Sequence, residues 1–490
     1  MQNLPNITQS TNDILNSLPY LAAEWTIISS FLLVIVLDLF IKKSKQIVFA
    51  IAMLGLLISA GFLFKQLNEI SAGLLLFNGM FSLTKAAIWF KLLVVLASFL
   101  SLLFFYQDNR LKNHTKGIND FISIFLASVL GMFLLISSAN LLMLYLSIEM
   151  LSLASYLMVS YNAYRDKQAE AGMKYVLFGA VASAMMLYGI SLIYGFTGTI
   201  NLYGNDLING LAQIGSAPTS LAIILLMTGI GFKLSFVPFH FWTPDAYQVA
   251  PTSVTSFLST APKIAVFGLL YYIMPSFQQI GQGLFPQIIL VVAASSMILG
   301  NTIAVFQTDP KRMMAYSAIG HTGFILMLFL LPQDAILKAL LFYLLAYTLM
   351  NAGTFMSFTH LENRFGAVNI SDYKGLGKKA PFIGALVVVL MVSLTGLPPT
   401  AGFIAKFLVF SSLINLASAD VFVAALLVIA ALTTVVSLFF YLNIPLNFFL
   451  KTSGNETEEK EGSNFLLLYV SIIAVLILIL GLFPSVVSFV

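Results

Sequence analysis

The chain has 490 residues, of which 59% are hydrophobic and only 9% charged, and its mean hydropathy is +0.95. Soluble domains are far less apolar, so this composition excludes a soluble globular protein and predicts an integral-membrane protein with many spans. The absence of cysteine excludes disulfides, thiolate metal ligands and cysteine-held iron–sulfur clusters. The net charge of +4 says little about partners, because in membrane proteins the placement of lysine and arginine matters more than their sum.

The first twenty residues are polar, contain no lysine or arginine, and lack the pattern of a cleavable signal peptide. After them, apolar runs long enough to cross a hydrocarbon core of about 30 Å follow one another along the chain. The runs predict fourteen helices, at 22–41, 47–65, 86–106, 119–137, 140–160, 171–194, 217–238, 253–273, 285–306, 314–331, 335–358, 382–409, 421–444 and 464–488. The expected fold is an all-α polytopic membrane protein that forms a single integral-membrane domain, 1–490.

Lysine and arginine are distributed unevenly between alternate connections of these helices. One set of connections holds sixteen of the 24 basic residues, and the opposite set holds only Lys65 and Lys85. Cytoplasmic loops of membrane proteins carry an excess of positive charge. The alternation therefore favours fourteen spans, places both termini outside and puts the basic loops in the cytoplasm.

Two predicted spans contain helix-breaking residues. The span at 217–238 runs into GIGFKLSFVPFHFWTPDAY, and the span at 382–409 contains SLTGLPPTAGFIAKF. Proline removes a backbone hydrogen bond and clashes with the preceding turn, so we expect both helices to break within the membrane. Matched breaks five spans apart predict two inverted five-helix repeats. The predicted parts are three N-terminal helices in 1–118, a first repeat at 119–273, a second at 285–444 and a final helix at 464–488.

Four ionisable residues lie deep in these spans. Glu149 is about 14 Å into its helix, Lys263 lies halfway along the helix at 253–273, and Lys233 and Lys406 adjoin the two predicted breaks. A charge at the centre of a membrane helix costs roughly 2.5 to 3.5 kcal/mol on insertion scales, so a chain that keeps several of them is expected to use them. These residues predict a path for protons or cations.

Three further lysines lie closer to helix ends. Lys91 and Lys338 are within about five residues of an end, so we expect their flexible stems to reach the membrane interface. Lys174 is about 5 Å inside the cytoplasmic boundary, where depth alone does not separate a functional residue from an interfacial one.

Burial disfavours the charged form of an ionisable group, so buried lysine and glutamate can exchange protons at neutral pH. A glutamate near a lysine favours the charged forms of both, which couples proton binding at one to proton binding at the other. The alternative is that Glu149 and a lysine form a static interhelical ion pair. Four lysines (Lys174, Lys233, Lys263 and Lys406) for one acid would leave most of them unpaired, which favours the proton path.

His321 lies about 13 Å beyond the basic pair Lys311 and Arg312, so it should reach the middle of its helix, where an imidazole is suited to proton relay or packs as a core residue. His240 lies between the prolines of the first break and could relay protons or cap broken backbone. The four histidines of the chain have no metal-ligand spacing.

The chain has no Walker A sequence and no GxGxxG in a strand–turn–helix setting, which argues against ATP-driven transport and direct dinucleotide binding.

Five long segments resemble the antiporter-like membrane subunits of respiratory complex I. They are LYLSIEMLSLASYLMVSY, EAGMKYVLFGAVASAMMLYG, KLSFVPFHFWTPDAYQVAPTSVTSFLSTAPKIAVFG, KRMMAYSAIGHTGF and LTGLPPTAGFIAKF, and the resemblance spans about 119–445. Lys406 and the fourteen-helix pattern argue against two other branches of this family, which carry a glutamate at that place or a long C-terminal lateral helix. The resemblance implies a proton-translocating subunit of a redox-driven complex in which electrons pass from NADH to quinone elsewhere.

By this resemblance, Glu149 and Lys233 form a coupled pair, Lys263 is the central relay and Lys406 lies on the exit side. Lys174 and His321 match further residues of the family's polar axis. Gln248 departs from the family, where many relatives have glutamate, so we assign it no acid–base role. Lys85, in FNGMFSLTKAAIWF, also departs from the family, because relatives often have an acid there, near a periplasmic hairpin.

The resemblance further implies that this chain binds no cofactor and that NADH, flavin, iron–sulfur clusters and quinone are bound by other subunits. The expected partners are other membrane subunits, including related antiporter-like ones, with the lipid bilayer and protons but no nucleic acid. The expected location is the bacterial cytoplasmic membrane. Two alternatives stay open: a subunit of a multisubunit sodium–proton antiporter, and a membrane anchor of a hydrogenase-type complex in which the charges are static.

Overall fold

The structure is a computed structural model that describes residues 7–40, 45–112, 118–161, 166–279, 283–452 and 464–487. His114 and several basic loop residues of the charge count lie outside these ranges. In the N-terminal half the elements are α1 (Ile7–Ser17), η1 (Leu18–Leu21), α2 (Ala22–Phe40), α3 (Lys45–Glu69), β1 (Leu74–Leu76), β2 (Phe81–Leu83), α4 (Lys85–Gln107), α5 (Asn109–Lys112), α6 (Asn119–Ser137), α7 (Leu141–Val159), α8 (Asp166–Thr197), α9 (Asn205–Ile214), α10 (Ser216–Leu234) and α11 (Trp242–Val249).

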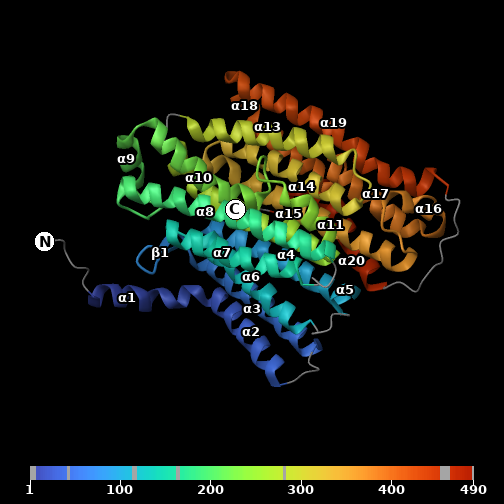
Figure 1. Cartoon of the computed structure of the whole chain (residues 1–490), viewed down its shortest axis with the longest axis horizontal. Helices are drawn as coiled ribbons and strands as arrows, with labels where there is room; N and C mark the ends of the chain where they lie inside the picture. The colour runs from blue at the N-terminus through green and yellow to red at the C-terminus, as the bar shows by residue number, and fades with distance from the viewer. Residues whose placement is uncertain are drawn as a thin grey trace.

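The C-terminal half continues as a bundle of long helices with short connecting elements (Figure 1). Its elements are α12 (Thr252–Gln279), α13 (Leu284–Ala304), α14 (Pro310–Leu326), η2 (Met327–Leu330), α15 (Gln333–Phe365), η3 (Ile370–Tyr373), α16 (Leu376–Lys379), α17 (Pro381–Thr395), α18 (Ala401–Ala419), α19 (Val421–Leu450), α20 (Asn464–Leu482) and η4 (Pro484–Val486).

Fourteen helices of the described residues are long and apolar enough to cross a membrane. This finding confirms the prediction of an all-α polytopic membrane protein. The inverted repeats, the description of each interrupted segment as one discontinuous span, and the division into parts stay predictions.

Several helix ends differ from those predicted. The helix expected to end at 238 ends at Leu234, and the one expected at 382–409 is two helices, α17 and α18, of which α18 continues to Ala419. Proline and glycine explain both changes, because Pro238 follows the first end and Gly396, Pro398 and Pro399 separate α17 from α18. The short helices α1 and α9 were not predicted, and the β1–β2 hairpin was indicated only by the family resemblance around Lys85.

The centre of the bundle is formed by α12, α14 and α15, whose most apolar stretches are 100%, 89% and 78% buried, respectively. In the outer helices α2, α19 and α20 only about a third of the most apolar stretch is buried, and apolar side chains on these helices are exposed. In a membrane an apolar exterior is the favourable one, and the buried polar side chains lie in the helix–helix seams and the core. Lys263 on α12 and His321 on α14 therefore lie at the middle of the molecule.

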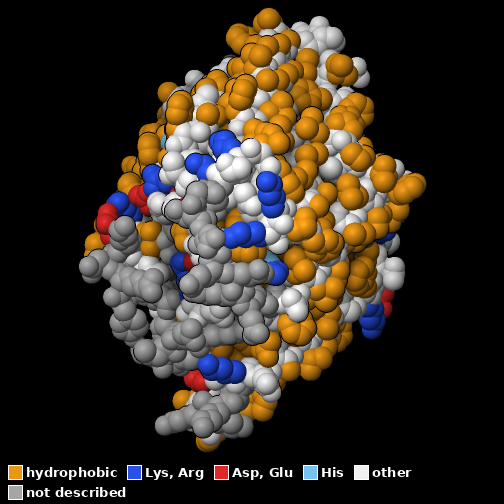
Figure 2. All heavy atoms as spheres, turned by 90° about the vertical axis from the view of Figure 1, so that its right-hand side faces the viewer, with side chains coloured by type: hydrophobic (Ala, Val, Ile, Leu, Met, Phe, Trp, Pro, Cys, Tyr) orange, Lys and Arg blue, Asp and Glu red, His pale blue; other side chains and the backbone are white. Residues whose placement is uncertain are grey.

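The two ends of the bundle differ in character. One end carries the antiparallel β1–β2 hairpin, whose Phe81 also pairs with Ser138. The opposite end carries α5 and α16 (Figure 1). Viewed from that side, described lysine and arginine side chains gather over part of the surface, beside a broad area of hydrophobic side chains (Figure 2).

Candidate functional site

The first buried lysine, Lys233, lies in the last turn of α10 and is 4% exposed. Its ammonium is 3.5 Å from the Tyr175 hydroxyl and 5.3 Å from the centre of the Tyr156 ring. Glu149 on α7 accepts a hydrogen bond from Ser183 on α8 and interacts electrostatically with both Lys233 and Tyr156. Among the described residues no ion pair joins Glu149 to a lysine, so the static pair considered from the sequence does not form here.

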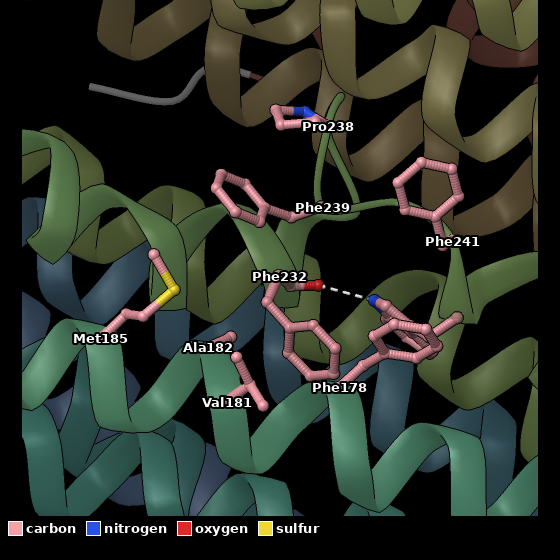
Figure 3. Close-up of a pocket in the computed structure, with 9 residues that line it drawn as sticks. Phe178, Val181, Ala182, Met185, Phe232, Pro238, Phe239 and Phe241 are labelled. Carbon is pink, nitrogen blue, oxygen red and sulfur yellow. Dashed lines mark hydrogen bonds between the residues drawn. The ribbon is translucent and has the colours of Figure 1, made fainter.

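The chain leaves the helical conformation directly after Lys233. Ser235 has a φ of 60°, in the left-handed region, and its N–H donates to the carbonyl oxygens of Gly231 and Phe232. Trp242, which begins α11, donates its indole N–H to the Phe232 carbonyl oxygen at 2.9 Å, the bond drawn as a dashed line in Figure 3. The Trp242 ring stacks on Tyr175 with 4.2 Å between ring centres. These contacts hold the end of α10 and fix the aromatic wall beside Lys233.

An apolar groove of about 260 Å³ opens on the other side of this wall. Phe178, Val181 and Met185 of α8 form one side, and Pro238 and Phe239 of the segment after α10 form the other (Figure 3). None of these side chains can take up or release a proton. The groove therefore borders the site of Lys233 without forming part of its proton chemistry.

The second buried lysine, Lys263, reaches from α12 to α14. Its ammonium donates to the Ala318 carbonyl oxygen and to the Thr322 hydroxyl, both at 2.9 Å. The Thr322 hydroxyl lies 3.1 Å from the carbonyl oxygen of Leu234, the last residue of α10. Thr322 thus bridges Lys263 to the residue that follows Lys233. Sequence reasoning missed Thr322, because an isolated threonine in an apolar helix gives no signal of its own.

His321 occupies the next position on α14. Its two ring nitrogens lie 2.8 Å from the Tyr343 hydroxyl and 3.2 Å from the Tyr441 hydroxyl. The imidazole interacts electrostatically with both Lys263 and Lys406. His321 therefore lies between the second and third buried lysines, and the two tyrosines orient its ring.

The third buried lysine, Lys406 on α18, lies at the end of α17. Its ammonium donates to the carbonyl oxygen of Thr395, the last residue of α17, at 2.8 Å and lies 5.0 Å from the centre of the Phe324 ring. The C-terminus of a helix carries partial negative charge, which stabilises a cation placed there. Gly396 caps α17 with a φ of +85°, and a β-carbon at this position would lie 2.7 Å from the Lys406 side chain. Only glycine fits both the backbone and the space.

Lys174 is not part of this buried group. It is 44% exposed and forms ion pairs with Glu170 at 2.8 Å and with Asp245 at 3.3 Å. Asp245 also pairs with Arg312 at 2.8 Å, and Arg312 donates to the side-chain oxygen of Gln248 at 3.0 Å. The structure places Lys174 in a half-exposed charge network formed by α8, α11 and α14.

The expectation for Lys91 is wrong. Lys91 does not reach the interface; it is 1% exposed and pairs with Glu24 at 2.5 Å. The buried carboxylate of Glu24 on α2 holds the ammonium inside the bundle. The expectation was based only on the distance of Lys91 from its helix end and did not include a partner on another helix. Both residues lie near the same ends of parallel helices, so a search for opposite charges at matched depth would have found the pair. Lys338, by contrast, is exposed on α15.

No group of three or more histidine, cysteine, aspartate or glutamate side chains that could hold a metal ion occurs in the part of the chain that the structure describes. The arrangement instead offers three buried lysines on α10, α12 and α18. Lys263 and Lys406 contact α14, and Thr322 of α14 reaches the backbone beside Lys233. Groups of this kind can bind and release protons within a membrane.

A family model described as NADH:quinone oxidoreductase/Mrp antiporter, transmembrane, matches residues 138–434. NADH-quinone oxidoreductase subunit N 2 of Chloroherpeton thalassium is 41% identical over 458 residues, which cover 91% of this chain and 88% of that relative. Among solved structures, a chain of respiratory complex I from Thermus thermophilus with bound aureothin is 30% identical with a TM-score of 0.77, covering 94% of this chain and 97% of that one.

A chain of the membrane-bound sulfane sulfur reductase, an archaeal respiratory membrane complex, has a TM-score of 0.84 at 23% identity and covers 96% of this chain and 95% of that one. At this identity the likeness is one of fold alone.

Proposed function

The chain belongs to the NADH:quinone oxidoreductase/Mrp antiporter transmembrane family, and from this membership we propose that it is a proton-translocating membrane subunit of NADH:quinone oxidoreductase. The similarity to the subunit N relative extends over nearly the full length of both chains. The chain contributes no redox chemistry of its own. It couples electron transfer in other subunits to the movement of protons across the membrane.

The proposed proton pathway is the central polar file, which we define as Glu149, Lys233, Lys263, His321 and Lys406. The observation that carries the proposal is the contact of Lys263 and Lys406 with α14, together with the approach of Thr322 on α14 to the end of α10. Thr322 bridges Lys263 to the end of α10, and His321 lies within electrostatic reach of both Lys263 and Lys406. His321 thus senses a change of charge at Lys263 or Lys406, and Lys233 senses a change of charge at Glu149.

In this proposal a proton arrives from the end that carries the basic loops and occupies Lys233 and Lys263 in turn. It leaves through Lys406. A proton on Lys233 is favoured while Glu149 is ionised, because opposite charges attract across the aromatic contacts of Tyr156. A change in that pair alters the proton affinity of Lys233 and drives the proton onward. Lys174, in its network with Asp245, is placed on the uptake side of the file.

The remaining assignments follow from the family. NADH, flavin, iron–sulfur clusters and quinone belong to other subunits of the complex, and the direct partners are its other membrane subunits, including related antiporter-like ones. The chain is placed in the bacterial cytoplasmic membrane with both termini outside. Within its single membrane domain, 119–273 and 285–444 are proposed as the two inverted repeats.

A sodium–proton antiporter subunit is the second candidate, because the matched family also includes the Mrp antiporters. Such a protein would exchange ions without NADH. A sodium-dependent and NADH-independent pH change in vesicles would favour it. Copurification with subunits of NADH:quinone oxidoreductase, together with NADH-driven proton uptake that does not need sodium, would favour the first function.

Replacement of Lys233 with alanine tests the proposal. In proteoliposomes that contain the whole complex, Lys233→Ala should remove most of the proton pumping, because the file then lacks the residue coupled to Glu149. The control is Lys338→Ala, which removes an exposed lysine from α15 and should pump normally. Full pumping by Lys233→Ala at a normal rate of electron transfer would refute the assignment.

A further inference from the structure

A second buried charge pair lies outside the central polar file. Lys91 on α4 donates to Glu24 Oε1 on α2 at 2.5 Å, and neither side chain is more than 2% exposed. The pair is enclosed by α2, α3, α4 and α6, which pack against one another. These helices lie largely outside residues 138–434, the part that the family model matches.

The pair is only partly satisfied. A buried ion pair is stable as a static element when further hydrogen bonds occupy the remaining lone pairs of the carboxylate. Glu24 Oε2 is buried and has no hydrogen-bond partner among the described residues. On the other side, the Lys91 ammonium lies 5.8 Å from the centre of the Phe133 ring, which supplies no acceptor for a proton. One carboxylate oxygen therefore lacks a hydrogen-bond partner among the described residues while the other holds the lysine.

Polar groups lead from Glu24 along the seam between α2 and α3. The Ser59 hydroxyl donates to the carbonyl oxygen of Ala23 at 3.2 Å, and Gln66 Nε2 donates to that of Tyr20 at 2.8 Å. Ser59 and Gln66 are seven residues apart, so they lie on the same face of α3. The series ends at the part of the molecule that carries the hairpin, where Tyr20 is partly exposed.

The pair is separated from the central polar file. Phe90 on α4 packs against Tyr271 of α12, with 5.8 Å between ring centres, while Lys91 reaches α2 instead. The residues of the central polar file face the other way: Lys263 of α12 and Tyr343 of α15 form hydrogen bonds with Thr322 and His321 of α14. The other charged side chains of the four enclosing helices lie toward helix ends: Asp38, Lys45, Lys65, Glu69, Lys85 and Asp120.

We propose that Glu24 and Lys91 form a second proton-binding site, which exchanges protons with water at the hairpin end of the molecule. A proton delivered by water forms an O–H bond on the Glu24 carboxylate and leaves a carboxylic acid beside the Lys91 ammonium. Release reverses the step, so the pair gains or loses one positive charge. The site goes beyond the proposed function, because it uses none of the residues of the central polar file.

Infrared difference spectroscopy of the whole complex in lipid membranes tests the site. Acidification should produce the band of a protonated carboxylic acid that is absent from Glu24→Gln. The control is Glu362→Gln, which removes a carboxylate paired with Arg110 at 2.6 Å and should keep the Glu24 band. If the complex with Glu24→Gln does not assemble, the double variant Glu24→Gln with Lys91→Met is used instead. It leaves neither charge of the pair in the bundle. Identical spectra of wild type and variant over the whole pH range in which the complex stays assembled would overturn the proposal.

The route to the site has its own test. After a pH jump on the hairpin side, Gln66→Leu should delay the Glu24 band several-fold, because it removes a polar group from the seam. The matched control is Gln333→Leu, whose amide donates to the Tyr271 carbonyl oxygen at 2.9 Å away from the seam, and it should show no delay. Equal rates in both variants, or a band that follows only acidification of the opposite side, would contradict exchange at the hairpin end.

Discussion

At the scale of single residues, Thr322 links the two halves of the central polar file. It accepts from Lys263 and reaches the Leu234 carbonyl oxygen one residue after Lys233. Valine has the same shape without the hydroxyl. A buried group that loses its hydrogen-bond partner is destabilised by about 1–3 kcal/mol. Thr322 therefore determines how Lys263 is held relative to the end of α10.

We predict that Thr322→Val lowers the rate of proton pumping about tenfold, the equivalent of about 1.4 kcal/mol in the barrier. The measurement is NADH-driven proton uptake by inverted vesicles, normalised to electron transfer. Thr348→Val is the control, because the Thr348 hydroxyl bonds only within α15, to the Leu344 carbonyl oxygen at 2.7 Å. Equal losses in the two variants would show that the Thr322 bridge has no special part.

The burial of Lys263 was predicted from its position halfway along an apolar run, and that of Lys233 and Lys406 from their positions beside the two predicted breaks; all three are buried. Depth alone failed for Lys91. Burial of a lysine near a helix end depends on a partner from another helix, here Glu24, and the sequence pattern of a single helix does not contain that information. Thr322 was not predicted either, because its contacts with Lys263 and Leu234 also come from other helices.

At the scale of elements, the interruptions after α10 and α17 position Lys233 and Lys406. Their approximate places were predictable, because proline and glycine have local backbone effects. The details were not. That Lys406 bonds to the last carbonyl of α17 depends on how α17 and α18 pack, which is a tertiary property.

Gly396→Ala is predicted to impair both stability and pumping. The left-handed backbone costs an alanine about 1–2 kcal/mol, and its β-carbon would displace the Lys406 side chain. Gly366→Ala is the matched control, because Gly366 caps α15 with a φ of +66° and has no neighbour within 4 Å. Both variants should lower the temperature at which the solubilised complex is inactivated. Only Gly396→Ala should lower the ratio of protons pumped to electrons transferred, and normal coupling in that variant would contradict the role of Lys406.

At the scale of the whole molecule, the number of spans and the all-α class were predictable from hydropathy alone, because a membrane requires long apolar helices. The contacts of Lys263 and Lys406 with α14 were not predictable, since α12 and α18 meet α14 through contacts between distant parts of the chain. The proposed proton file depends on the central position of α12 and α14, which carry Lys263 and His321.

The ratio of protons pumped to electrons transferred in the whole complex, measured with Lys263→Ala in proteoliposomes, tests the central claim most directly. Lys263 joins the two halves of the file, so its loss should separate them. The account predicts a lower ratio in an assembled complex that still reduces quinone. An unchanged ratio would contradict proton transfer through the buried lysines of this chain.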